Sequence, residues 1–586
     1  MARIVAVGQR VVALPHWRWS PLLLWFYLAL VVLLICFPIA MVALGGFNVA
    51  APGEGFRFGL SNWQRAWSDP QIRPALWNTF AIVAARMALG FVIATLLAWL
   101  VARTNLPGAG WFEFAFWLAF FLPTLASIQG WTLLLEGRSG LVNQWLQAVP
   151  FLPPSPLDVY SFWGIVWVHV MSHTVSTLFI LLVEAFRNMD AGLEEAARTS
   201  GASELVTLYR ITLPLMRPIL GLLVILSFVR GMQSFEIERV LGSPVGIQVY
   251  ATLVVDMLGD EPPRLPEGAA LSTLVLAALV PLIFAQRRFI GERQYTTVTG
   301  RMRHGKADLR GWRWPAFGLT LGFALLSTAV PFLAMVLGSF MRRWGYFQIA
   351  EPWTLRHWET VLSDSTFIAS LTSSIVLGVV SGVAGVVVMF LVAYVLVRTS
   401  FAGRALLDFV SWLPWAIPGV LLSLGILTMV LDVPALRALH GTLLVLVLAV
   451  VLFRFPLGVH LLKSGLLQLG QEMEEAARAS GAGWWYTQAR ITLPVLLPML
   501  VAAGLMTCVT ALNDVSGVIL LASVQTRTLS LLALDYLVGQ RAEKEAAAVV
   551  TTIIVLLAVG LTLVARRIGT AGLADTVAGP PEQKPE

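Results

Sequence analysis

Residues 194–218 read EEAARTSGASELVTLYRITLPLMRP, and residues 474–498 read EEAARASGAGWWYTQARITLPVLLP. In both segments Glu-Ala-Ala is followed by three residues, a glycine, nine residues and Ile-Thr-Leu-Pro. The two copies begin 280 residues apart in a chain of 586 residues. Because self-similarity at a long, fixed offset indicates repeated structural units, the sequence predicts a tandem duplication.

Each copy predicts a short helix, a break and a second helix. The acidic residues stand in a first turn, where the helix dipole favours negative charge. The alanines add no bulk, the glycine suits a left-handed helix cap, and the proline suits the first turn of a new helix. These positions are Glu194, Glu195, Ala196, Ala197, Gly201 and Pro214 in the first copy, and Glu474, Glu475, Ala476, Ala477, Gly481 and Pro494 in the second.

The composition is that of a polytopic membrane protein. The chain is 58% hydrophobic and 12% charged, and its mean hydropathy is +0.78. A helix needs about 20 apolar residues to cross the hydrocarbon core. The sequence therefore predicts an all-α protein with about twelve transmembrane helices, near 20–46, 76–102, 111–135, 162–186, 218–241, 269–286, 315–340, 370–397, 406–430, 441–463, 496–521 and 546–565.

The repeat extends over six spans in each half. Arg103-Thr104 ends the second span as Arg398-Thr399 ends the eighth, and we pair Leu122-Pro123 with Leu413-Pro414. An even number of spans makes the halves parallel, with a pathway expected between them. We divide the chain into a first half at 1–286 with its loop at 187–217, a basic linker at 287–314, a second half at 315–567 with its loop at 467–497, and a disordered tail at 568–586.

Basic residues predict the orientation. The arm before the first span, the linker at 287–314 and the segment after the last span are all rich in arginine. Since cytoplasmic segments carry an excess of Lys and Arg, both termini and both repeated loops are expected on the cytoplasmic side. The first span is long and lacks a small-residue cleavage site, which predicts an anchor rather than a removed signal peptide. This distribution explains the net charge of +7 without a nucleic-acid partner.

Polar residues recur at one level of the two halves. The repeat aligns Gln233-Ser234 with Asn513-Asp514, and Glu236 follows the first pair. Arg86 and Glu238 also fall within predicted spans. Ionisable groups in a membrane usually face the protein interior, so these side chains either line a pathway or form buried pairs that fix helix packing.

Two histidines stand four residues apart in the predicted fourth span. His169 and His173 share a helix face, but no further ligands accompany them, so interhelical hydrogen bonding is favoured over a metal site. Cys36 and Cys508 lie within spans and indicate neither a disulfide framework nor a thiolate site. We therefore predict no metal and no cofactor bound by this chain.

The linker contains a partial phosphate-binding pattern. Residues 300–306 read GRMRHGK, but Ala307 stands where the pattern needs Ser or Thr for magnesium, and no buried strand precedes it. The segment is therefore interpreted as a basic loop, and no ATPase site is predicted in the chain. We also find no paired nucleophile and base, so the chain is not expected to be an enzyme.

The duplicated segment resembles the EAA loop of binding-protein-dependent ABC importer permeases. The resemblance covers the whole chain and implies two fused halves with the type I importer permease fold. It implies coupling helices that dock on two copies of a cytoplasmic ATPase, which binds ATP and Mg. It also implies a periplasmic or lipid-anchored solute-binding protein and a location in the bacterial inner membrane.

Weaker motifs resemble ferric-iron permeases within that class. They are Ser234-Phe235-Glu236, the QYTTVTG segment at 294–300 and Leu512-Asn513-Asp514-Val515. Thiamine and polyamine permeases share the architecture, so thiamine, a polyamine or another small solute is the alternative to ferric iron as the transported solute. The alternative class is an ion-coupled secondary transporter, because twelve spans in two parallel halves also describe many such carriers.

Overall fold

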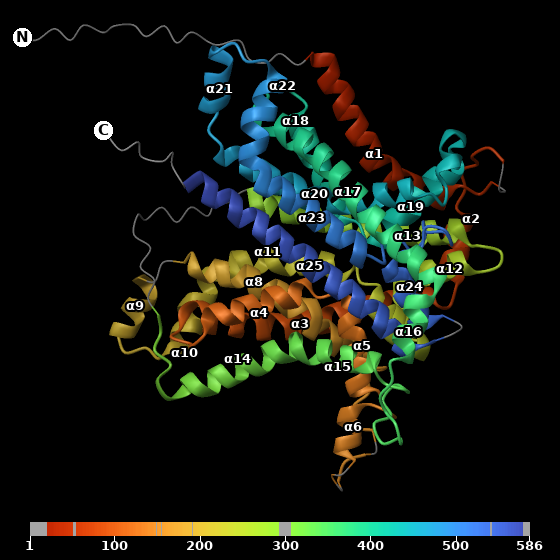
Figure 1. Cartoon of the computed structure of the whole chain (residues 1–586), viewed down its shortest axis with the longest axis vertical. Coiled ribbons are helices and arrows are strands. Elements are labelled where there is room, and N and C mark those ends of the chain that lie inside the picture. The colour runs from red at the N-terminus through yellow and green to blue at the C-terminus, as the bar shows by residue number, and fades with distance from the viewer. Residues whose placement is uncertain are drawn as a thin grey trace, which may run out of the picture.

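The computed structural model describes residues 20–577 apart from 51–53, 148, 150, 154, 190–191, 292–305 and 540–541. Throughout this part of the chain the regular structure is helical, with isolated β-bridges between loops (Figure 1). The predicted all-α class is confirmed. The basic arm before residue 20, most of the linker and the QYTTVTG segment lie outside the described residues.

Ten helices in the described residues are long and apolar enough to cross a membrane. Each corresponds to one of the twelve predicted spans, which confirms ten apolar helices at these places, although the predicted span 496–521 ends earlier, at Asn513. The remaining two predicted spans, 111–135 and 406–430, are bent helix pairs. The ten run over Pro21–Phe47 (α1), Ile72–Arg103 (α3), Phe162–Arg187 (α7–α8), Leu208–Gly231 (mostly α11), Leu265–Leu282 (in α13), Arg310–Ser339 (α14–α15), Ser365–Arg398 (α17), Leu443–Gln468 (α20), Trp484–Asn513 (α22–α23) and Lys544–Val564 (in α25).

The two bent pairs break at equivalent prolines. A residue that precedes proline is disfavoured in the helical region, so the first helix of each pair ends just before Pro123 or Pro418. Our pairing of Pro123 with Pro414 is therefore wrong, because Pro414 lies inside a helix. The pairs are α4 (Ala109–Phe121) with α5 (Thr124–Leu135), bent by 99°, and α18 (Arg404–Ala416) with α19 (Gly419–Asp432), bent by 110°.

A third bent pair was not predicted. The predicted span at 218–241 is too long at its end, because α11 stops at Gly231. Beyond it the segments Glu238–Val245 and Tyr250–Gly259 (α12) form a pair bent by 77°. Residues 236–239, which we assigned to the end of a span, therefore lie on a separate turn. An apolar composition that continues across such a break gives no signal of where the helix ends.

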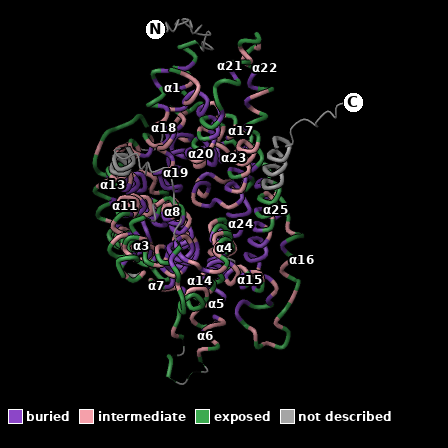
Figure 2. The backbone as a smooth tube through the Cα atoms, turned by 90° about the vertical axis from the view of Figure 1, so that its left-hand side faces the viewer, coloured by how far each residue is buried: buried purple, intermediate pink, exposed green. Residues whose placement is uncertain are grey.

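The two halves exchange their first helices. Helix α1 packs on α18 and α19 of the second half, and Trp25 contacts Phe401 with ring centroids 4.9 Å apart. Reciprocally, α14 (Arg313–Ser327) and α15 (Ala329–Ser339) pack on α4 and α5 of the first half. In Figure 1, α14 runs beside α4. Phe112 on α4 contacts Phe317 on α14, and their ring centroids lie 5.5 Å apart. The halves therefore form one interlocked bundle with its buried residues along the centre (Figure 2).

Short helices lie at the two ends of the bundle. Figure 1 places α9 (Gly192–Thr199) and α21 (Glu472–Ala479), which belong to the duplicated segment, along one edge of the molecule. It places α2 (Ser61–Ser68) and α16 (Arg356–Ser363) toward the opposite edge. The expected disorder from residue 568 is wrong up to Val577, where α25 (Lys544–Val577) ends; the tail beyond lies outside the described residues.

Candidate functional site

The first glutamate of each repeated segment is buried in an ion pair. Glu194 on α9 and Glu474 on α21 are each 5% exposed. Glu194 pairs with Arg103 at the end of α3, and Glu474 pairs with Arg398 at the end of α17. Each loop helix is thereby attached to the last turn of a membrane-spanning helix. The internal repeat places the two arginines at equivalent positions, but nothing in the sequence identifies them as partners of the glutamates.

The first pocket holds its carboxylate with two side chains. Arg103 donates from Nη2 at 2.5 Å and from Nε at 3.2 Å to Oε2 of Glu194. Thr212 donates from its hydroxyl to Oε1 of Glu194 at 2.7 Å. Arg103 also donates from Nη1 to the carbonyl oxygen of Met189 at 3.2 Å, so it ties the segment before α9 to α3 as well. Both oxygens of Glu194 are therefore satisfied inside the protein.

The second pocket uses the same residue types with looser geometry. Arg398 donates from Nε to Oε1 of Glu474 at 3.0 Å, and Thr492 donates to the same oxygen at 3.5 Å. Arg398 also donates from Nη2 to the carbonyl oxygen of Leu469 at 2.7 Å. Oε2 of Glu474 accepts from the hydroxyl of Tyr394 at 3.5 Å. A third donor has thus been added in the second half.

Tyr394 connects this pocket to the aromatic start of the next helix. Its hydroxyl oxygen accepts from Nε1 of Trp484 at 3.0 Å and from Nε2 of Gln488 at 3.4 Å. At the equivalent positions the first half has Trp99, Glu204 and Leu208. The polar junction around Tyr394 is therefore a property of the second half.

The two predicted cap glycines are confirmed as left-handed. Gly201 has φ +85° and Gly481 has φ +81°, a region that penalises a side chain. Both are exposed, and a Cβ built at either one would meet no atom within 4 Å. Within this chain the demand for glycine therefore comes from the backbone conformation alone.

The other repeated residues of α9 and α21 are less buried than the two glutamates. Ala196 and Ala476 are exposed, whereas Glu195, Glu475, Ala197 and Ala477 are partly buried. Beyond the glycines, Tyr209 is 70% exposed and Trp485 is 80% exposed. Exposed small residues let another protein approach the helix closely, and exposed aromatic rings offer it apolar surface.

Pro214 and Pro494 lie in the first turn of α11 (Leu213–Gly231) and α23 (Leu493–Asn513), as predicted, but these helices do not follow a break in the chain. A five-residue π-helical turn precedes each proline, over Leu208–Thr212 and Gln488–Thr492, and continues from the short helix before it. The N–H of Leu213 bonds the carbonyl of Leu208, five residues back. A wide turn accommodates a proline that lacks its own donor. The short helix after each cap glycine, Glu204–Thr207 or Trp484–Thr487, therefore runs into the span as one continuous element.

The residues predicted to line a pathway meet near the junction of the two halves. Nε2 of Gln233 donates to the carbonyl oxygen of Trp415 in the second half at 2.8 Å. Glu236 lies within electrostatic range of Asp514. Oδ1 of Asn513 and Oδ2 of Asp514 are buried without a hydrogen-bond partner. Ser234 instead donates to Oε2 of Glu238 at 2.6 Å, so it belongs to a buried pair.

That pair is part of a buried network in the first half. His169 contacts Nη1 of Arg86 through Nδ1 at 2.7 Å and Oε1 of Glu238 through Nε2 at 2.8 Å. His173 contacts the hydroxyl of Thr124 at 3.1 Å. The interhelical hydrogen bonding that we favoured for both histidines is confirmed. Among the described residues, no group of three His, Cys, Asp or Glu side chains is arranged to hold a metal ion.

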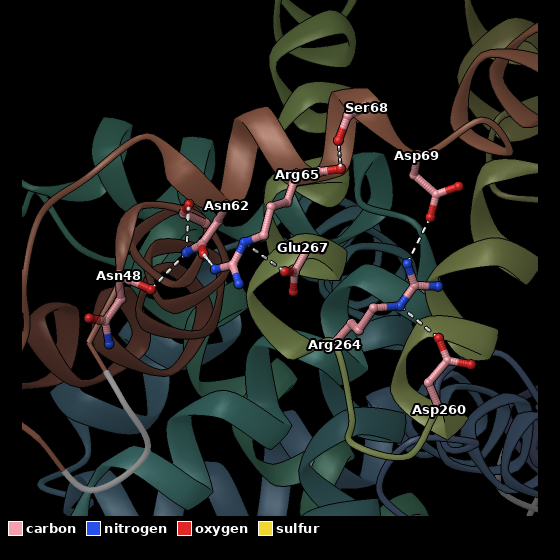
Figure 3. Close-up of polar contacts among 9 residues, drawn as sticks. Asn48, Asn62, Arg65, Ser68, Asp69, Asp260, Arg264 and Glu267 are labelled. Carbon is pink, nitrogen blue, oxygen red and sulfur yellow. Dashed lines mark hydrogen bonds and ion pairs between the residues drawn. The ribbon is translucent and has the colours of Figure 1, made fainter.

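At the opposite end of the bundle, α2 is attached to α13 by a second set of ion pairs (Figure 3). Arg65 pairs with Glu267 at 3.2 Å, and Arg264 pairs with Asp69 and Asp260, each at 2.7 Å. The hydrogen bond to Asp69 raises the pKa of Arg264. All of these residues except Asp260 border an open cleft of about 440 Å³, which is lined by Arg65, Ser68, Asp69, Pro70, Gln71, Arg264 and Glu267.

The fold and the paired pockets define a class of protein: a duplicated, polytopic helical membrane protein with a matched loop helix in each half. The family described as binding-protein-dependent transport system inner membrane component matches residues 385–570. That stretch of the chain is thus similar to the inner-membrane components of binding-protein-dependent transport systems.

Relatives of the chain carry permease names. The chain is 27% identical over 403 residues to a putative ferric transport system permease from Haemophilus influenzae, covering 68% of this chain and 62% of that relative. It is 27% identical over 512 residues to a probable ABC transporter permease from Sinorhizobium fredii, covering 85% and 88%. It is 28% identical over 223 residues to the sulfate transport system permease of Escherichia coli, covering 36% and 76%.

Proposed function

We propose that the chain is the membrane-spanning permease of an ABC importer and that α9 and α21 couple it to a separate ATPase. The observation that carries the proposal is the pair of buried attachments, Arg103 with Glu194 and Arg398 with Glu474. Each joins an exposed loop helix to a membrane-spanning helix. Because a buried ion pair costs free energy when broken, a displacement of the loop helix is transmitted to the span.

The mechanism follows from the position of these attachments. Two ATPase subunits on the cytoplasmic side dock on α9 and α21, bind ATP and Mg, and move the loop helices toward each other. The continuous elements that run into α11 and α23 carry this motion into the bundle. The interface between the halves then opens alternately to each side of the inner membrane, as in a rigid-body switch.

The residues at the junction of the halves are proposed to line the pathway. Gln233, Glu236, Asn513 and Asp514 come from both halves, and two of their oxygens are buried without a partner. Hard cations prefer oxygen ligands. The ferric name of the Haemophilus relative and these oxygens together favour ferric iron as the solute over sulfate. A solute-binding protein would deliver it to the outer face near α2 and α16.

Reconstitution in liposomes tests this function. The chain is combined with its cognate ATPase and binding protein, and uptake of ferric iron and of sulfate is measured with ATP or with ADP inside. ATP-dependent uptake of iron supports the proposal. Uptake that needs only an ion gradient, without the ATPase, would overturn it in favour of a secondary transporter.

A pair of variants tests the docking surface. Ala196→Arg combined with Ala476→Arg places a long charged side chain on the exposed face of each loop helix. We expect loss of ATPase copurification with an unchanged amount of chain in the membrane. Thr360→Arg, on the exposed face of α16 at the opposite end, is the matched control and should retain the ATPase.

A further inference from the structure

The end of the linker between the halves is bound to the loop that follows α3. Residues 306–309 lie against residues 103–105, and a parallel β-bridge joins Thr104 to Ala307. We interpreted the linker as a basic loop, and nothing in its sequence predicted this contact. Ala307 is only 4% exposed. The contact joins the start of the second half to the residues that hold the first loop helix.

Two backbone hydrogen bonds and two side-chain hydrogen bonds make this contact. The N–H of Ala307 donates to the carbonyl oxygen of Arg103 at 2.7 Å, and the N–H of Asn105 donates to the carbonyl oxygen of Ala307 at 3.0 Å. Nδ2 of Asn105 donates to Oδ1 of Asp308 at 2.6 Å. Oδ1 of Asn105 accepts from the N–H of Leu309 at 3.1 Å.

The linker segment contacts Arg103, the same residue that holds α9 through Glu194. Arg103 offers its carbonyl oxygen to the linker and its guanidinium to Glu194. Asp308 accepts a further bond from the N–H of Arg310 at 3.1 Å, which fixes the turn into α14. The bond from Arg310, followed by that from Asn105, lowers the pKa of the Asp308 carboxyl. Helix α14 in turn packs on α4, so the segment bridges the halves beside the pocket of Glu194.

The second half has a different residue at the corresponding place. Ser400 follows Arg398-Thr399 as Asn105 follows Arg103-Thr104. A serine hydroxyl donates and accepts through a single oxygen, so it cannot present a donor and an acceptor on two separate atoms as the amide of Asn105 does. The contact made through both atoms of the Asn105 amide therefore has no counterpart of the same residue type at Ser400.

We propose that residues 306–309 act as a strap that positions the first loop helix, with Asn105 and Asp308 as its positioning residues. The proposal rests on the coupling role given above to α9. The strap holds the backbone of Arg103, and through it the guanidinium that binds Glu194. By joining this point to α14, it lets movement of the first loop helix act on the second half as well as on α3.

The test uses a charge conflict and its exchange. Asn105→Asp places a carboxylate against that of Asp308. In the unaltered chain both Asn105 and the N–H of Arg310 donate to Oδ1 of Asp308. The double variant Asn105→Asp with Asp308→Asn removes the charge conflict, and a rotation of the new amide at position 308 lets its Nδ2 donate to the carboxylate at position 105 while its Oδ1 accepts from the N–H of Arg310. Ser400→Asp is the matched control in the second half. Each chain is assembled with its ATPase and binding protein, and the solute transported per ATP hydrolysed is measured.

We expect Asn105→Asp to lower the ratio of transport to hydrolysis roughly threefold, because the strap lies near the surface, where charge interactions are modest. The double variant should recover the ratio of the unaltered chain, and Ser400→Asp should not change it. A ratio for Asn105→Asp equal to that of the unaltered chain, or a double variant that fails to recover, overturns the strap. If the unaltered complex shows no ATP-dependent uptake, the proposed function itself fails, which is a distinguishable result.

A label on each loop helix provides a second readout that is independent of transport. A spin label is placed at Thr199 on α9 or at its repeat equivalent Ala479 on α21, both exposed, with Cys36 and Cys508 replaced by serine. Asn105→Asp should increase the mobility of the label at 199 and leave the label at 479 unchanged. Equal changes at both positions, or no change at 199, would contradict a strap that acts on the first loop helix.

Discussion

The two loop-helix pockets share a design but differ in how firmly the glutamate is held. Glu194 receives two bonds from Arg103 and a short bond from Thr212. Glu474 receives one bond from Arg398 and two long bonds from hydroxyl groups. In the first pocket Arg103 makes most of the bonds to the glutamate. In the second pocket Arg398, Tyr394 and Thr492 make one bond each. Duplication has thus kept the ion pair and let its surroundings diverge.

Removal of the arginine should have the largest effect and should differ between the pockets. Arg103→Met leaves Glu194 buried without its charge partner, at a cost of about 3–5 kcal/mol for a broken buried pair. Arg398→Met should cost less, because Arg398 gives Glu474 one hydrogen bond where Arg103 gives Glu194 two, and because the other oxygen of Glu474 still accepts from Tyr394. The measurement is thermal unfolding of the purified complex together with ATP-dependent uptake. Equal losses in the two variants would remove the proposed difference between the pockets.

A side chain at the cap glycines should have an intermediate and equal effect. Gly201→Ala and Gly481→Ala force a side chain into the left-handed region, which costs roughly 1–2 kcal/mol per residue. Asn tolerates this region, so Gly201→Asn and Gly481→Asn are the milder controls. A Cβ at either position meets no atom of this chain within 4 Å, so Gly→Val should cause no steric clash there. Its cost in stability should come from the backbone conformation alone. A loss of ATPase binding beyond the loss of stability would locate the partner's surface at these glycines.

Loss of the tyrosine hydroxyl should affect only the second pocket. Tyr394→Phe removes the acceptor for Trp484 and Gln488 and a donor to Glu474, with an expected cost of about 1–2 kcal/mol. Trp99→Phe, at the equivalent place, is the comparison, and its cost should come from lost volume instead. Mobility of a label at 479 should rise in Tyr394→Phe, and mobility at 199 should stay constant. An effect on the label at 199 would argue that the pockets are not independent.

Substitution of the threonines should give the smallest effects. The two effects should differ, because the hydrogen bond from the threonine to the glutamate is shorter in the first pocket than in the second. Thr212→Val removes a bond of 2.7 Å and should cost about 1 kcal/mol. Thr492→Val removes a bond of 3.5 Å and should cost close to zero. Both changes conserve the side-chain shape, so unfolding temperature is a direct measure. A larger loss for Thr492→Val would show that the second pocket closes more tightly in the assembled complex.

Much of the architecture could be predicted from the sequence because its signals are local. Long apolar runs marked ten continuous spans, and a repeated glycine marked the left-handed caps at Gly201 and Gly481. The breaks before Pro123 and Pro418 were missed, because each proline lies inside an apolar stretch that is long enough to span a membrane. The π turns before Pro214 and Pro494 were missed because their residues carry no distinguishing composition.

The contacts that make the site were harder to predict because they join distant positions. Arg103 and Glu194 are 91 residues apart, and nothing in either neighbourhood specifies the other. The repeat did hold a usable signal, since Arg103 and Arg398 occupy equivalent places and a pair of buried charges requires partners. The contact of Asn105 with Asp308, 203 residues apart, has no equivalent residue pair in the repeat and left no such signal.

The exchange of first helices bears on how the chain is synthesised. Helix α1 packs on α18 and α19, which begin near residue 404, so its partner surface does not exist until most of the chain has been translated. At roughly 5–20 residues per second, α1 waits in the bilayer on the order of tens of seconds. During that interval its packing face is covered only by lipid and by neighbours from its own half. Two halves made as separate polypeptides would have to find each other before either could complete its bundle, and joining them in one chain removes that search.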